Sequence, residues 1–175
     1  MSMGKTVFES FSKLDVKTDL IGLEKTTGED FFCVPVGAKI FAALGVDGIQ
    51  FCFIAGFGEM VFSISPEAIN GKYVNPLAPT FEEFLGLVLE CKNANPIEQI
   101  YWQTKEQFVA FLQDDIKNVF QEQNEILAQI QNELKISPIT DPYNYVRRVQ
   151  ASFDYSQIKY SDEYYDILGL PRPSD

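Results

Sequence analysis

Two short runs with a period of two, joined by a glycine-containing turn, constrain this chain more than any other feature. In residues 49–54 (IQFCFI) and 60–65 (MVFSIS), alternate side chains fall on opposite faces of an extended backbone, and AGFGE joins the runs. Two such runs with a five-residue connection predict a β-hairpin. Gly56 and Gly58 are expected to supply positive φ angles in the turn. Phe57, between them, is expected either to fold back on the sheet or to be exposed for contact.

The same glycines could suggest a phosphate-binding loop, but the pattern does not fit one. A dinucleotide loop needs GxGxxG between a strand and a helix, and a P-loop needs GxxxxGK followed by Ser or Thr. The segment GFGEMV has only GxG, and a strand-like run follows it. The hairpin is therefore the better interpretation.

Helical and strand-like segments surround this hairpin. We expect a short helix over residues 6–14, an edge strand or lead-in at FFCVPV (31–36), one or two helical turns over 38–48, and a third strand at GKYVNPLA that Pro76 and Pro79 stop. Thr80 with Glu83 forms one capping box and Thr104 with Gln107 a second, and each predicts a helix start. Between them, residues 97–103 suggest a short strand or a turn.

The second of these helices has a helical period as far as residue 135, with a break expected near 122–125, and a short helix is expected near NYVRRVQ. The predicted fold class is α+β, with a central, mainly antiparallel sheet flanked by helices and a helical C-terminal extension. We divide it into a domain at 1–135 and an acidic, tyrosine-rich extension at 136–175.

The charge of the chain limits its partners. Its 175 residues carry a formal net charge of -11, which repels nucleic acid and anionic lipid and attracts a basic partner. The simpler alternative is that the acidity only keeps the protein soluble. We expect no nucleic acid and no membrane as partners, and a monomer or a weak dimer.

Cysteine usage and the N-terminus suggest a cytoplasmic protein. The three cysteines lie far apart in apolar runs without a CxxC pattern, so we expect reduced, buried thiols rather than a zinc or redox site. The N-terminal MSMGKTVFES has no apolar region typical of a signal peptide, and no apolar run is long enough for a membrane span.

The absence of histidine weighs against catalysis. With none in the sequence, every Ser-His or Cys-His mechanism is excluded. Adjacent carboxylates occur at 82/83, 114/115 and 162/163, but neighbours on a helix point about 100° apart and do not share a proton. We expect no catalytic residue, no metal site and no cofactor.

Contact residues for a partner are sought among aromatic and acidic side chains. Trp102 is expected to be a core or groove-wall residue. The tyrosine-rich tail is either an ordered appendage or an interaction surface. The candidate partner-binding residues are Phe57, Glu59, Trp102, Tyr160, Asp162, Glu163, Tyr164, Tyr165 and Asp166.

The hairpin GIQFCFIAGFGEMVFSIS, the proline-containing strand leading into TFEEFLGLVL, and YWQTKEQFVAFL together resemble the SUKH superfamily, the family of the yeast cell-wall assembly regulator. The likeness covers about residues 6–112, and the F-x-x-F-L-x-x-L pattern of the family corresponds to Phe81, Phe84, Leu85 and Val88. The long helix and the tail lie beyond it. The resemblance implies a non-enzymatic immunity protein that binds and blocks a toxin, often a nuclease or deaminase.

We therefore expect a cytoplasmic immunity-type protein that neutralises a basic, nuclease-like toxin by direct binding. One alternative is a regulatory or scaffolding module for a host protein or small ligand. A carboxylate-based enzyme is another, and it would need two acids converging in one cavity.

Overall fold

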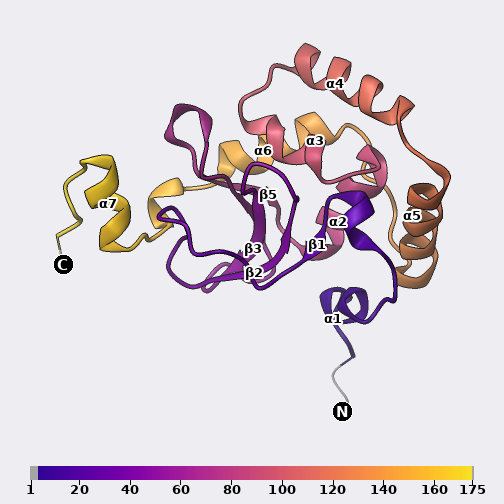
Figure 1. Ribbon diagram of the computed structural model, residues 1–175, viewed down its shortest axis with the longest axis horizontal. Coiled ribbons are helices and arrows are strands. Elements are labelled where there is room, and N and C mark those ends of the chain that lie inside the picture. Colours follow the sequence, from indigo (N-terminus) through magenta and orange to yellow (C-terminus); the bar gives the residue numbers. More distant parts are fainter. Residues whose placement is uncertain (1–3, 175) are drawn as a thin grey trace.

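The computed structural model describes residues 4–174, and at its centre is a five-stranded antiparallel sheet. The strands are β1 (Glu24–Lys25), β2 (Ala38–Ala43), β3 (Gln50–Ile54), β4 (Val61–Ile64) and β5 (Val74–Ala78). They lie side by side in sequence order, each antiparallel to its neighbour, so the sheet is a simple meander (Figure 1). The α+β class with a mainly antiparallel sheet is confirmed.

Seven α-helices are found within the described residues. They are α1 (Val7–Ser12), α2 (Phe81–Cys91), α3 (Asn95–Glu98), α4 (Lys105–Lys117), α5 (Gln121–Leu134), α6 (Pro142–Ser152) and α7 (Asp162–Leu168). Figure 1 shows α5 and α7 towards opposite ends of the molecule, with the sheet between them.

The predicted hairpin is formed by β3 and β4. Cys52 lies opposite Phe62 in its register, and Gly56 and Gly58 have φ angles of 96° and 59°, so the predicted glycine conformations are confirmed. A strand follows these glycines rather than a helix, and the turn therefore lacks the helix N-terminus that a phosphate loop needs.

Apolar side chains fill both faces of the sheet. On the first face, Phe51 and Val61 pack with Phe81 and Phe84 of α2. On the second face lie the alternate residues of the same strands, packed against residues 31–34 and against the chain after α6. The Val36 amide donates to the Lys159 carbonyl over 2.8 Å, which ties these two covering segments together.

The chain beyond residue 135 belongs to both cores. Ile136 and Val146 are part of the first-face cluster, and Ile158 is part of the second. Helix α6 packs along β5, where the Gln150 side-chain amide donates to the Pro76 carbonyl over 3.3 Å.

The segment from Ala38 to Ala43 corrects the sequence prediction, because it is strand β2 and not a helical turn. The register shifts between Ile40 and Ala42. This bulge brings Phe41 and Ala42, although adjacent in sequence, into the same first-face cluster. The alternation typical of a strand is broken at that point, which is why the pattern resembled a helix.

Other boundaries also differ from the prediction. Strand β5 continues through Pro76 to Ala78, because β5 is an edge strand and its register shifts beside this proline. For the segment predicted as a short strand or a turn, residues 95–101 form helical turns, which excludes the strand. The long helix breaks earlier than residue 122, since Asn118 ends α4 and Phe120, with extended backbone, precedes α5.

Candidate functional site

The sequence-predicted contact residues lie in two separate places. The first is the second face of the sheet, where Phe57 folds back from the hairpin turn. Its ring lies 5.5 Å from that of Phe62 and 5.6 Å from that of Phe153. Phe57 is therefore a packing residue of the second core, while Glu59 beside it is exposed.

The tail tyrosines hold the C-terminal segment on this same face. The rings of Tyr160 and Tyr164 are stacked with centroids 3.8 Å apart, and Tyr164 also contacts Phe32 and Tyr73. Burial raises the pKa of the Tyr160 hydroxyl above its ordinary value. Tyr165, half-buried, packs edge-on against Tyr164. These rings stabilise the fold more than they offer a free surface.

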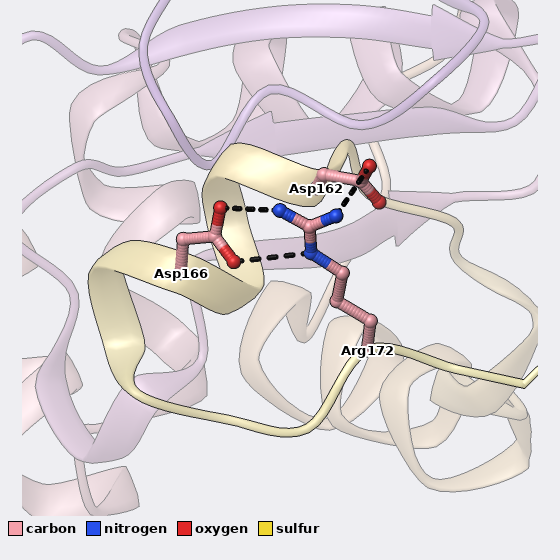
Figure 2. A network of polar contacts seen from close by, with 3 residues as sticks. All are labelled: Asp162, Asp166 and Arg172. Atoms are coloured by element: carbon pink, nitrogen blue, oxygen red, sulfur yellow. Dashed lines mark hydrogen bonds and ion pairs between the residues drawn. The ribbon is translucent and has the colours of Figure 1, made fainter.

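Two of the tail acids already pair with one arginine of the tail. Arg172 donates to both carboxylate oxygens of Asp166, over 3.1 and 2.6 Å, and to Asp162 over 3.0 Å (Figure 2). The hydrogen bonds from this guanidinium lower the pKa of the Asp166 carboxyl. Of the three predicted tail acids, only Glu163 is outside this network, and it is exposed.

Trp102 lies in the second place, at the wall of a hollow beside α3. It is 40% exposed. The hollow has a volume of about 300 Å³, and its lining includes Asp47, Glu67, Glu98, Tyr101 and Trp102. None of the other predicted contact residues lines it, so the structure separates Trp102 from the tail.

A larger hollow adjoins this one. Its volume is about 810 Å³, and its lining includes Glu24, Glu29, Asp47 and Glu67. Asp47 and Glu67 line both hollows. We call the two hollows together the acidic face. Among the residues that the structure describes, its lining has five carboxylates and no Lys or Arg.

The β2–β3 turn positions Asp47 at the junction of the hollows. Leu44 and Ile49 close the turn through a 2.9 Å hydrogen bond, and Asp47 and Gly48 both have positive φ. A Cβ on Gly48 would lie 2.9 Å from the Pro66 ring, so the turn touches the loop after β4 at this glycine. This close approach brings Asp47 and Glu67 to the same hollow.

The wall beside Glu29 is fixed by a reciprocal pair of hydrogen bonds. The Glu29 amide donates to the Gln50 side-chain oxygen over 2.6 Å, and the Gln50 side-chain amide donates to the Glu29 carbonyl over 3.1 Å. Gln50 is buried. The loop before β2 is thereby held to β3, while the Glu29 carboxylate stays exposed.

Glu98 is the most unusual group of the acidic face. The residue is only 5% exposed, and no hydrogen bond or ion pair of its carboxylate is found within residues 4–174, although the carboxylate oxygens are not among the fully buried polar atoms. Burial, with a smaller contribution from the negative charge of Asp47, raises its pKa from 4.5 to about 7. At neutral pH a fraction of this carboxyl group is therefore protonated.

The sequence analysis missed most of this site. Glu98 stands in PIEQIYW between Ile97 and Ile100, both fully buried, and an acid within an apolar helical run is the one signal that could have singled it out. Of the other four carboxylates, Glu24 lies in β1 and the other three lie in loops, and none is unusual when taken alone. Only the meander brings them together.

The arrangement is suited to binding a positively charged group. Carboxylates and aromatic walls attract positive charge. In the described part of the chain, no group of three or more His, Cys, Asp or Glu side chains is placed to hold a metal ion. Over the same residues, no helix is long and apolar enough to cross a membrane.

Comparisons with known proteins give no relative for this chain. No family model matches the sequence, and no curated protein and no solved structure matches it significantly.

Proposed function

We propose that this chain is a cytoplasmic immunity-type protein that neutralises a basic, nuclease-like toxin by binding it, without catalysis, at the acidic face. The observation that carries the proposal is the lining of the two adjoining hollows, which has five carboxylates and, within the described residues, no cation to balance them. The resemblance of the sequence to SUKH proteins stays a prediction and points to the same function.

The electrostatics of the whole chain support such a partner. A protein with net charge -11 attracts a basic surface from a distance, and complementary charge raises association rates above the ~10⁵–10⁶ M⁻¹s⁻¹ of neutral pairs. A toxin that cleaves nucleic acid needs basic residues where it contacts phosphates. An acidic face that covers those residues would block access of the substrate.

The exposed apolar side chains beside the acids provide the remaining contact area. Val46, Ile69 and Trp102 line the smaller hollow and are 55%, 44% and 40% exposed. Protein interfaces commonly combine an apolar or aromatic centre with charged groups around it. The acidic face has both parts.

The test uses affinity capture from cells of the source organism with substituted forms of the whole chain as bait. Truncation is unsuitable, because removal of the chain after residue 135 would take Val146 and Ile158 out of the two cores. The test variant instead reverses three charges of the acidic face, with Glu29→Lys, Asp47→Lys and Glu67→Lys. A control variant with the same net charge reverses three exposed acids elsewhere, with Glu82→Lys, Glu125→Lys and Glu133→Lys.

We expect the wild-type and control baits to retain a basic protein that the acidic-face variant loses. Expressed alone, the captured protein should arrest growth, and co-expression of the wild-type chain should restore it. Equal retention by all three baits, or a captured protein without toxicity, would contradict the proposal.

A module that holds a small ligand is the second candidate. The larger hollow, at about 810 Å³, falls in the size range of small-molecule sites, roughly 300–1,000 Å³. Capture of no basic protein, together with a thermal shift by a small cationic metabolite, would favour it.

A further inference from the structure

We propose that the smaller hollow is an anchor site for a single arginine side chain of the basic partner, with Glu98 pairing with the guanidinium and Trp102 forming a wall against its plane. This inference deepens the proposed function and depends on it for the source of the arginine. It concerns one side chain of the partner, whereas the proposed function concerns the charge of a whole surface.

Glu98 lacks a hydrogen-bond or ion-pair partner among residues 4–174. A buried carboxylate normally has hydrogen-bond donors or a cation around it, because an unpaired buried charge is strongly unfavourable. Glu98 is 5% exposed and lines the smaller hollow. No hydrogen bond or ion pair of its carboxylate is found in the described part of the chain, and the carboxylate oxygens are not among the fully buried polar atoms, so they are open to the hollow. Its charge is therefore left for a ligand to balance.

The position of Trp102 also favours a cation. Glu98 is the last residue of α3, and a single 3₁₀ turn, Gln99–Tyr101, separates it from Trp102. Both line the smaller hollow. A cation paired with Glu98 would then have an indole ring within its surroundings, and indole is the aromatic side chain that attracts cations best.

The walls around these two residues are fixed. The Tyr101 hydroxyl accepts a hydrogen bond from the Ile69 amide over 3.1 Å, which joins the loop after β4 to the helical turn after α3. The Arg147 side chain donates to the Tyr101 carbonyl over 3.2 Å. A site whose walls are already in place loses little entropy when it binds.

The chemistry favours a guanidinium over an ammonium or a metal ion. A guanidinium is planar and weakly hydrated, and it can pair with a carboxylate through two parallel hydrogen bonds while it stacks on an aromatic ring. An ammonium is strongly hydrated and cannot stack. A divalent ion would need several oxygen ligands, and residues 4–174 offer no cluster of three such acidic or sulfur ligands.

Charges at the mouth of the hollow would guide the arginine to its site. Asp47 and Glu67 line the smaller hollow together with Glu98, and both are exposed. Like charges on one side of a cavity raise the local concentration of cations. The exposed acids thus attract the side chain, and the buried acid pairs with it.

The test is a titration of the purified whole chain with N-acetyl-arginine amide at constant ionic strength and pH 8, followed by tryptophan fluorescence. Trp102 is the only tryptophan of the chain, so the signal comes from the site itself. N-acetyl-citrulline amide, which has the same shape without the charge, is the matched control. N-acetyl-lysine amide tests the preference for a guanidinium.

We expect saturable binding of the arginine compound in the millimolar range, which is typical of so small a ligand. The citrulline compound should not saturate, and the lysine compound should bind several-fold more weakly. Glu98→Gln should weaken arginine binding at least ~10-fold, and Glu125→Gln should leave it unchanged. Trp102→Leu, followed by calorimetry, should also weaken it.

The outcomes separate this inference from the proposed function. Equal responses to arginine and citrulline, equal binding of arginine and lysine, or arginine binding unaffected by Glu98→Gln would overturn the anchor site, even if the charge-reversal experiment succeeded. Saturable, Glu98-dependent arginine binding with no basic protein captured would support the anchor site and overturn only the proposed function.

Discussion

Glu98→Gln should stabilise the folded protein at alkaline pH and have little effect at acid pH. The pKa of Glu98 rises from 4.5 to about 7 on folding, mainly because the residue is buried. An acid with a raised pKa binds its proton more tightly in the folded state. Its contribution to stability is therefore complete below pH 4.5 and is lost as the pH rises through 7.

The size of this change in stability follows from the two pKa values of Glu98. Each pH unit between them changes the free energy of unfolding by about 1.4 kcal/mol, so the ionised Glu98 destabilises the fold by about 3 kcal/mol at pH 8. The glutamine of the variant cannot ionise. The difference in unfolding free energy between the variant and the wild type should accordingly be about 3 kcal/mol larger at pH 8 than at pH 4.

Urea unfolding followed by circular dichroism at half-unit pH steps from 4 to 8.5 measures this difference. The other charged or titratable groups around Glu98, which are Asp47, Glu67, Tyr101 and Arg147, are common to both proteins. Glu125→Gln, which removes an exposed carboxylate, is the control variant. A difference between Glu98→Gln and the wild type that does not change with pH would refute the reasoning from burial.

Three further predictions concern packing. In urea unfolding, Gly48→Ala should destabilise the fold by about 3 kcal/mol and Gly58→Ala by about 1 kcal/mol. Both glycines have positive φ, but only a Cβ at Gly48 would have neighbours within contact distance. Equal losses of stability would contradict the close approach of the β2–β3 turn to the loop after β4. Gly86→Ala, inside α2, should destabilise by about 2 kcal/mol although alanine favours helices, since its Cβ would lie 2.9 Å from the Ser137 carbonyl oxygen; a gain in stability would show that this contact relaxes freely. The three cysteines should not react with a disulfide reagent at pH 8 until the protein is unfolded. All three are buried, and burial raises the pKa values of their thiols, that of Cys33 to about 11. A thiol that reacts in the native protein would contradict this prediction.

Local signals predicted those parts of the fold that depend on neighbouring residues. The hairpin, the helix starts at Thr80 and Thr104, and the glycine turn at Gly56 and Gly58 all follow from short patterns, and all are present. Strand β2 was not predicted by such a pattern, because a bulge opposite β3 breaks the alternation of its side chains between the two faces of the sheet. A bulge depends on a partner strand that the local sequence does not specify.

The candidate site shows the same limit more strongly. Trp102 was singled out for its residue type alone, and it lines the smaller hollow. Glu98 is close to it in sequence, but Asp47 and Glu67 come from separate loops, and only the assembled fold brings these two acids to the hollow. The tail acids Asp162 and Asp166, in contrast, are close in sequence to Arg172 and pair with it. This ion pairing could have been predicted from the short sequence separation, but only the acidic residues of the tail were considered.

The order of the chain also has a consequence for biosynthesis. The sheet is complete at Ala78, yet the C-terminal part of the cover over its second face begins at Phe153, about 75 residues later. At a synthesis rate of ~5–20 residues per second, only residues 31–34 cover that face for roughly 4–15 seconds on every translating ribosome. Phe62, Ile64 and Cys52 would meet water, other nascent chains or a chaperone before they meet their own tail. Slow translation of the last third of the message should therefore increase aggregation of the newly made protein more than slow translation of the first third.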